Sequence, residues 1–341
     1  MAKTILITGA NGEVGHGLIR TLGEQDHTLL ALDMHPMDTT LFPYLHRHWV
    51  GNILDEKLIT QIFDEYSIDV VFHMAAMLST SAEHRPTLAH QVNVQGTLSL
   101  LEAAQSHAEK HRKKIIFLFP SSIAVYGLPN IETKTRVGAI DEEQFLHPIT
   151  IYGITKLHCE ELGRYYTYHY KQLDTTSHAQ YVDFRSLRFP GLISADTVPS
   201  GGTSDYGPEM LHAAAQNQPY AAFVRPDTTI PFMAMPDAVK ALIMLAQAPN
   251  EALTRTVYNV TSFSLSAEQI ATTTQKFFPT AQIEYKPHSG RQQIVDSWPA
   301  LIDDQAARRD WGWLPDYDAE RAFDDYLIPA IKRHYQVGQN A

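Results

Sequence analysis

In the first half of the chain, runs of consecutive apolar residues alternate with longer stretches in which apolar residues return every three or four positions. The continuous runs predict strands buried on both faces, as in a parallel sheet, at residues 3–8, 27–32, 70–73, 115–119 and 181–188. The periodic stretches predict amphipathic helices at residues 15–23, 56–66 and 92–110. This alternation is typical of an α/β protein with a Rossmann-type, doubly wound parallel sheet.

The pattern changes after Pro190–Gly191, where proline and glycine become more frequent and the elements shorten. This half predicts helices at residues 208–216 and 237–247 and strands at residues 256–260 and 282–285. We therefore expect a Rossmann domain over residues 1–190 and a smaller, interwoven lobe that covers most of residues 191–341. A segment at about residues 232–262 is expected to pack back onto the first domain.

The composition is that of an ordinary globular protein, with 44% hydrophobic and 19% charged residues. A formal net charge of -11 without a basic block argues against a nucleic-acid partner. No apolar run is long enough to span a membrane, and the start MAKTILITGA lacks the features of a signal peptide. The single cysteine, Cys159, cannot form an internal disulfide. We therefore expect no membrane association and a cytoplasmic location.

The segment TGANGEVG, residues 8–15, follows the first predicted strand and opens a helix. Gly9 permits a tight turn, Gly12 lets a diphosphate approach the backbone, and Gly15 lets the helix pack close to the strand. The free amides at the N-terminus of a helix favour bound negative charge. The first predicted turn is therefore a candidate dinucleotide site.

Asp33 follows the second predicted strand, 18 residues after Gly15. A carboxylate at this place can accept hydrogen bonds from the ribose hydroxyls of an adenosine and would repel a 2′-phosphate. This favours NAD over NADP as the cofactor. Asn52 and Ile53, further along the chain, are expected to flank the adenine.

Tyr152 and Lys156, in TIYGITK, are four residues apart and so share one face of a predicted helix. Lowering a tyrosine pKa from about 10 to about 7 takes roughly 4 kcal/mol of preferential stabilisation of the phenolate. The Lys156 ammonium and a positive nicotinamide ring can share that work in a desolvated cleft. Ser122, in PSSIAVYG, can hydrogen-bond the same substrate oxygen. These three side chains suit removal of a hydroxyl proton while hydride leaves the carbon.

With these motifs, the chain resembles members of the extended short-chain dehydrogenase/reductase superfamily. The matching segments are the glycine turn, HMAA (73–76), NVQGT (93–97), SSIAVYG (121–127) and the Tyr152-x-x-x-Lys156 pair. The resemblance implies that Ser122, Tyr152 and Lys156 are catalytic. It implies that NAD is bound by Gly9, Asn11, Gly12, Glu13, Val14, Asp33, Asn52, Ile53, Met74, Ala75, Ala76, Asn93, Tyr152, Lys156, Pro190 and Leu192.

The second half resembles the short-chain type of L-threonine 3-dehydrogenase, through segments such as LRFPGLIS (187–194), TTIPFMAMPDAVKA (228–241) and DDQAARRDWGW (303–313). The resemblance implies oxidation of the threonine side-chain hydroxyl to 2-amino-3-oxobutanoate, with Tyr152 as the base. The resemblance also implies that the C-terminal lobe binds the substrate. The implied substrate contacts are Ser79, Ser122, Tyr152, Gly191, Gly202 and Thr203.

The loop PSGGTSDYG, residues 199–207, is expected to recognise the substrate. Gly201 and Gly202 would allow close approach, and Thr203 would supply a hydroxyl. Asp205 is expected to cap the helix that follows.

Four features depart from the family pattern and border the expected pocket. Ser200 replaces the first glycine of a GGGT loop, and Tyr126 stands where phenylalanine is frequent. Residues 171–180 resemble an insertion, and the segment from Gly127 to Tyr152 is a few residues longer than the pattern. Two enzyme alternatives stay open, namely a nucleotide-sugar epimerase or dehydratase and a dehydrogenase of another small hydroxy compound. The first would need cations for a diphosphate sugar, yet no Arg or Lys occurs from Pro226 to Val239. A non-catalytic NAD sensor would have no use for a catalytic base.

The histidines and one aromatic run give weaker functional predictions than the motifs above. His46/His48 and His107/His111 have the spacing of metal ligands but no acidic or cysteine partner in a recognisable motif, so we expect surface histidines and no metal site. His73 is expected to be a hydrogen-bonded core residue. The run RYYTYHY, residues 164–170, continues the helix of Tyr152 and favours either core packing or a helix–helix seam between the subunits of a homodimer.

Overall fold

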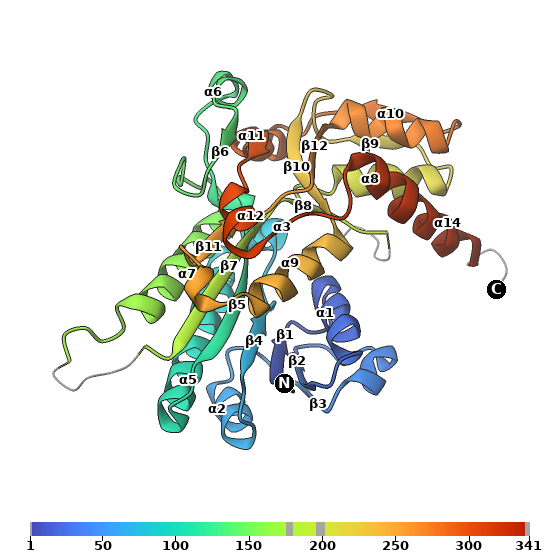
Figure 1. Cartoon of the computed structure of the whole chain (residues 1–341). Helices are drawn as coiled ribbons and strands as arrows, with labels where there is room; N and C mark the ends of the chain where they lie inside the picture. Colours follow the sequence, from blue (N-terminus) through green and yellow to red (C-terminus); the bar gives the residue numbers. More distant parts are fainter. Residues whose placement is uncertain (1, 175–179, 196–201, 338–341) are drawn as a thin grey trace.

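A seven-stranded parallel sheet forms the centre of the computed structural model, which describes residues 2–174, 180–195 and 202–337 (Figure 1). Its strand order is β11-β7-β5-β4-β1-β2-β3. The strands are β1 (Thr4–Thr8), β2 (Thr28–Asp33), β3 (Arg47–Val50), β4 (Val70–His73), β5 (Ile115–Ser122), β7 (Val182–Phe189) and β11 (Val257–Asn259). The order reverses between β1 and β4, which confirms the predicted doubly wound fold and marks where a ligand site is expected.

Helices cover both faces of this sheet (Figure 1). One face carries α2 (Glu56–Glu65), α5 (Gly96–His111) and α7 (Ile151–Tyr168), and the other carries α1 (Glu13–Gly23) and α9 (Met235–Gln247). Side chains alternate between the faces of a strand, so Ile5 and Ile7 of β1 join the α1/α9 core while Leu6 joins the α2/α5/α7 core. This two-sided burial is the reason that the central strands are continuous apolar runs.

Two parts of the first half differ from the pattern-based prediction. The edge strand β3 has the sequence RHWV and is largely exposed, so it carries no apolar run to reveal it. The helix predicted from residue 92 begins as a π-helical turn, η2 (Gln91–Gln95), and becomes regular only at Gly96. The shorter elements of this half are η1 (Thr39–Tyr44), α3 (Ser79–His84), α4 (Pro86–His90), η3 (Ile123–Val125), α6 (Ile131–Arg136) and β6 (Ala139–Ile140).

Three small sheets and several helices form a second unit around its own core (Figure 1). Its sheets have the orders β12-β10-β8, β13-β9 and β14-β6. Its strands are β8 (Gly191–Ile193), β9 (Tyr220–Ala222), β10 (Thr229–Ala234), β12 (Phe263–Ser266), β13 (Ile283–Tyr285) and β14 (Leu301–Ile302). The remaining helical elements are α8 (Tyr206–Ala215), η4 (Asn250–Ala252), α10 (Ala267–Phe277), α11 (Ser289–Ser297), α12 (Gln305–Trp311), α13 (Ala319–Arg321), η5 (Ala322–Leu327) and α14 (Ile328–Val337).

Several segments of the chain cross between the two units. β11 hydrogen-bonds to β7 in the central sheet, and α9 packs beside α1. In the opposite direction, Tyr126 and Ile140 belong to the core of the second unit. The division into domains at residue 190 stays a prediction, and these crossings show why its boundary is not a single point in the chain. No helix within the described ranges has the length and apolar character needed to cross a membrane.

Candidate active site

The glycine turn lies between β1 and α1, beside the end of β4. Gly9 has φ of +65°, and a Cβ built on it would lie 2.5 Å from the backbone nitrogen of Ala75. A Cβ on Gly15 would overlap the carbonyl oxygen of Ala10. Glycine is therefore required at both positions, because one needs a left-handed backbone and both need close backbone approach. These contacts place Met74 and Ala75 beside the turn, and Ala76 follows them in the chain.

Gly12 is less crowded than the other two glycines. Apart from its neighbours in the chain, the described atom within 4 Å of a Cβ built there is the Gly9 carbonyl oxygen, at 3.2 Å. Glu13 and Val14 follow as the first residues of α1, whose N-terminal amides favour an anion. A small residue at a helix N-terminus fits a dinucleotide diphosphate.

Asp33 is held at the end of β2, next to the glycine turn. Its carboxylate accepts hydrogen bonds from the backbone nitrogens of Asn11 (3.0 Å) and His35 (2.9 Å). The Asn11 side chain accepts from the Asp38 nitrogen (2.9 Å) and donates to the Pro36 carbonyl (3.2 Å). The turn and the loop after β2 are therefore tied together, with the Asp33 carboxylate between them.

Asn52 and Ile53 follow β3, one strand further along the same sheet edge. The nitrogen of the preceding residue, Gly51, donates to the Asp33 carbonyl (2.8 Å). Ile53 is buried, and Gly96 at the start of α5 packs against it. Both predicted adenine neighbours therefore lie on the Asp33 side of the site.

Asn93 joins the loop after β4 to the helix of Tyr152. Its side-chain oxygen accepts from the Met77 nitrogen (2.7 Å). Its amide nitrogen donates to the Met77 carbonyl and to Thr155 Oγ1, both at 3.1 Å. These contacts fix Asn93 between the segment after β4 and α7, and its part in NAD binding stays a prediction.

Ser122, Tyr152 and Lys156 meet at the carboxyl end of β5. Ser122 is the last residue of that strand, and its hydroxyl accepts from the Ala124 nitrogen (3.2 Å). Tyr152 lies in the first turn of α7, and the ammonium of Lys156 is 5.6 Å from the centre of its ring. The same ammonium donates to the Pro120 carbonyl at 2.6 Å. The three predicted catalytic residues therefore share one site.

Ser79 and Thr203, which are 124 residues apart in the chain, contact each other. Thr203 Oγ1 donates to Ser79 Oγ at 3.3 Å, and Thr203 is buried. The Gly202 nitrogen donates to the Asp205 carboxylate (2.5 Å), which makes no side-chain cap of α8. The predicted capping by Asp205 is therefore wrong, because its carboxylate turns back to Gly202. Ser200 and Gly201 lie outside the described residues.

Pro190, Gly191 and Leu192 connect β7 to β8. The last residue of β7, Phe189, is paired with Ser122 of β5, so this connection starts beside Ser122. A Cβ on Gly191 would lie 2.8 Å from the ring of Phe232 in β10. Glycine therefore lets the chain pass between the two units at this point.

Residues 5–261 match the model of the family described as NAD dependent epimerase/dehydratase. The chain belongs to this family. A relative from Bos taurus, named L-threonine 3-dehydrogenase, mitochondrial, is 34% identical over 93% of this chain and 79% of its own length.

Two solved structures resemble this family member over almost its whole length. One is the holo form of a GalE-like L-threonine dehydrogenase from Cupriavidus necator, with a TM-score of 0.82. The other is a monomeric L-threonine 3-dehydrogenase from a metagenome database in its apo form, with a TM-score of 0.83. Each is 34% identical, and each alignment covers 96% of this chain and 99% of the other. The protein is an NAD-dependent oxidoreductase, and these matches point to NAD(H) as its cofactor.

The electrostatics of this oxidoreductase's site are dominated by burial. Burial raises the pKa of Tyr152 to about 12, although a hydrogen bond with Ser122 opposes the rise. Burial lowers the pKa of Lys156 to about 8, against the opposing influence of Cys159 and Glu160. Burial therefore opposes the lowered tyrosine pKa that the motif predicts, whereas positive charge near the phenolate would lower it.

The structure also bears on the predictions for the histidines and for Tyr126. His73 is a hydrogen-bonded core residue, as predicted, since its ring contacts Thr8 Oγ1 (2.7 Å) and Thr97 Oγ1 (3.0 Å). His107 is 8% exposed, so the prediction of a surface histidine is wrong for it. Tyr126 is fully buried and its hydroxyl donates to Asn259, so this residue does not present its hydroxyl to the pocket. Within the described ranges, no three potential ligands gather as a metal site.

Proposed function

We propose that this enzyme oxidises the side-chain hydroxyl of L-threonine with NAD to give 2-amino-3-oxobutanoate. The observation that carries the proposal is the convergence of Ser122, Tyr152 and Lys156 at the end of β5. The similarity to relatives named L-threonine dehydrogenases supports the choice of substrate.

Each catalytic side chain has a distinct task in this proposal. The Tyr152 phenolate accepts the proton of the substrate hydroxyl, while Ser122 Oγ hydrogen-bonds the same oxygen. The Lys156 ammonium stabilises the phenolate by its positive charge. NAD, when bound, takes up the hydride from the carbon that carries the hydroxyl.

The cofactor would lie along the carboxyl edge of the sheet. Gly9, Gly12 and the start of α1 would hold the diphosphate, and Asp33 would bind the adenosine ribose, with Asn52 and Ile53 near the adenine. Residues 74–76, Pro190 and Leu192 would contact the nicotinamide half. Ser79 and Thr203, whose hydroxyls lie 3.3 Å apart, would bind the amino acid.

The proposal is tested by the absorbance of NADH formed from NAD and L-threonine, between neutral and alkaline pH. L-serine, D-threonine and UDP-glucose serve as comparison substrates. We expect L-threonine to be the best of the four. Absence of its turnover with NAD at every pH tested would rule out this function.

Asp33→Ala is expected to weaken NAD binding about 10-fold or more while weakening NADP binding less, because only NAD gains hydrogen bonds from this carboxylate. Fluorescence titration with NADH and NADPH measures both dissociation constants. Asp26→Ala is the matched control, since this carboxylate lies in the α1–β2 connection away from the site. Equal losses for the two cofactors would show that Asp33 does not read the ribose.

A second candidate is a nucleotide-sugar epimerase or dehydratase, because the matching family model includes both activities. Conversion of UDP-glucose without net NADH formation would favour it over threonine oxidation. For the assembly we propose a homodimer that uses the outer face of α7, where Tyr165 and Tyr168 are 40% and 52% exposed.

A further inference from the structure

Behind the Tyr152–Lys156 turn lies a buried ion pair that the proposed chemistry does not use. Glu160 follows Lys156 by one turn of α7, and Arg188 is on β7. The guanidinium of Arg188 donates two hydrogen bonds to the Glu160 carboxylate, at 2.9 Å and 2.6 Å. The side chains are 3% and 2% exposed. A bidentate pair at this depth is strongly oriented, because each ion would be costly to bury alone.

Arg188 is fixed by further contacts from other elements. Its Nη1 donates to the Glu142 carbonyl (2.6 Å) and to the Tyr126 hydroxyl (3.0 Å). Tyr126 in turn donates to Asn259 Oδ1 at 2.6 Å. The guanidinium is therefore held between α7, the segment after β5 and β11.

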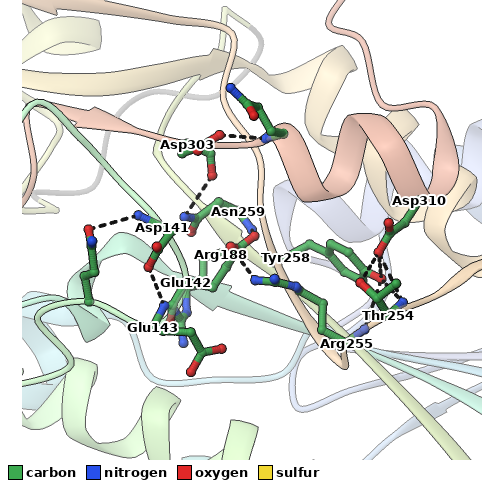
Figure 2. Close-up of polar contacts among 12 residues, drawn as sticks. Asp141, Glu142, Glu143, Arg188, Thr254, Arg255, Tyr258, Asn259, Asp303 and Asp310 are labelled. Carbon is green, nitrogen blue, oxygen red and sulfur yellow. Dashed lines mark hydrogen bonds and ion pairs between the residues drawn. The ribbon is translucent and has the colours of Figure 1, made fainter.

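Figure 2 shows the polar contacts that continue from Arg188 to Glu142, Arg255 and Asn259. The Glu142 carboxylate pairs with Arg255 (2.6 Å) and accepts from the Asn259 nitrogen (3.0 Å). The Asn259 amide donates to the carbonyls of Ile140 (3.3 Å) and Asp303 (3.2 Å). Glu142 thus has its own arginine, which leaves the charge of Arg188 to balance Glu160.

Lys156 does not pair with the carboxylate nearest to it on its own helix face. Residues four apart on a helix are within reach of each other, so Glu160 could pair with Lys156. In the described part of the chain, however, Lys156 forms no ion pair with Glu160, and its ammonium donates to the Pro120 carbonyl and lies near Tyr152. The titratable or charged groups that surround it are Tyr152, Cys159, Glu160, Arg188 and His73.

We infer that Glu160 and Arg188 are positioning residues for the Tyr152–Lys156 turn. Arg188 holds the Glu160 carboxylate away from Lys156, so that the ammonium stays beside Tyr152. The inference rests on the proposed role of Tyr152 as the base.

Removing the positive charge and removing the negative charge of the pair are expected to shift the pKa of Tyr152 in opposite directions. Arg188→Met leaves a buried carboxylate free to draw the ammonium away from Tyr152, which raises the tyrosine pKa. Glu160→Gln removes the competing carboxylate and keeps the Arg188 charge, which lowers it. Glu160 lies about one helical turn from Lys156 and about two turns from Tyr152, and each shift of the Tyr152 pKa is expected to be about 0.5 pH unit or more. Arg188→Lys keeps the charge and is the matched control.

The experiment records tyrosinate absorbance during a pH titration of the NAD complex, which needs no substrate. The step that belongs to Tyr152 is isolated by subtracting the curve of the same protein with Tyr152→Phe. We expect the pKa to rise in Arg188→Met, to fall in Glu160→Gln and to stay at the wild-type value in Arg188→Lys. Thermal unfolding establishes beforehand that each variant is folded.

Three outcomes decide the inference. Opposite shifts in the two charge-removing variants support it. Unchanged values, or shifts in the same direction, overturn it and leave the pair a structural role only. Absence of a tyrosinate step in the wild-type complex contradicts the base role itself and overturns both proposals. If Arg188→Met does not fold, Glu160→Gln must lower the pKa while Arg188→Lys leaves it unchanged, and any other result overturns the inference.

Discussion

Tyr152→Phe is expected to lower kcat for threonine oxidation by a factor of about 10² to 10⁴, the usual contribution of a positioned acid–base group. The substitution removes only the hydroxyl, so the ring keeps its place in the first turn of α7. NAD affinity is expected to change little, because the glycine turn and Asp33 are untouched. Steady-state kinetics and a separate cofactor titration measure the two effects.

Tyr168→Phe is the matched control for this prediction. Tyr168 is on the same helix and is 52% exposed, away from the end of β5. Wild-type kcat is expected for it. If Tyr152→Phe keeps more than about one tenth of the wild-type kcat, the hydroxyl of Tyr152 is not the base.

Gly153→Ala is expected to damage both stability and catalysis, although Gly153 carries no chemistry. A Cβ on this residue would overlap the carbonyl oxygen of Ala124 and lie 2.9 Å from Cβ of Pro148. Because Ala124 is two residues after Ser122, relief of the overlap must move the Ser122 segment and the Tyr152 turn apart. We expect destabilisation of about 1–3 kcal/mol and a fall in kcat of about 10-fold or more.

Denaturant unfolding and steady-state kinetics measure these two losses. Gly290→Ala is the matched control, since Gly290 lies in α11 and a Cβ built on it would come no closer than 3.5 Å to its nearest neighbour, His288. This control is expected to be neutral or more stable by about 0.5 kcal/mol. Wild-type stability and kcat in Gly153→Ala would show that the packing of α7 against the Ser122 segment is not restrictive.

Local segments of the sequence were sufficient to predict the fold class and the composition of the site. Each motif combines a strand end with the turn or helix that follows, as in residues 8–15 and 150–156, and parallel strands bring such ends to one edge of a sheet. The apolar runs identified the buried strands because those strands are covered on both faces. A search for apolar runs does not find β3, because this edge strand is largely exposed and its sequence, RHWV, contains no such run.

Contacts between distant residues could not be predicted in this way. The sequence suggested that the Asp205 side chain caps α8 and did not indicate a partner for the Tyr126 hydroxyl, because the direction of a side chain depends on the elements packed around it. Asp205 turns to Gly202, and Tyr126 finds Asn259, 133 residues further along the chain.

The sequence by itself therefore determined the parallel sheet, the glycine turn, and the presence of Ser122, Tyr152 and Lys156 near one another, because these follow from short-range pattern and strand direction. Only the tertiary structure decided that Thr203 meets Ser79 and that Arg188, not Lys156, takes the carboxylate of Glu160. The physical reason is that a buried charge must be paired, and its partner is selected by the packing of elements that lie far apart in the chain.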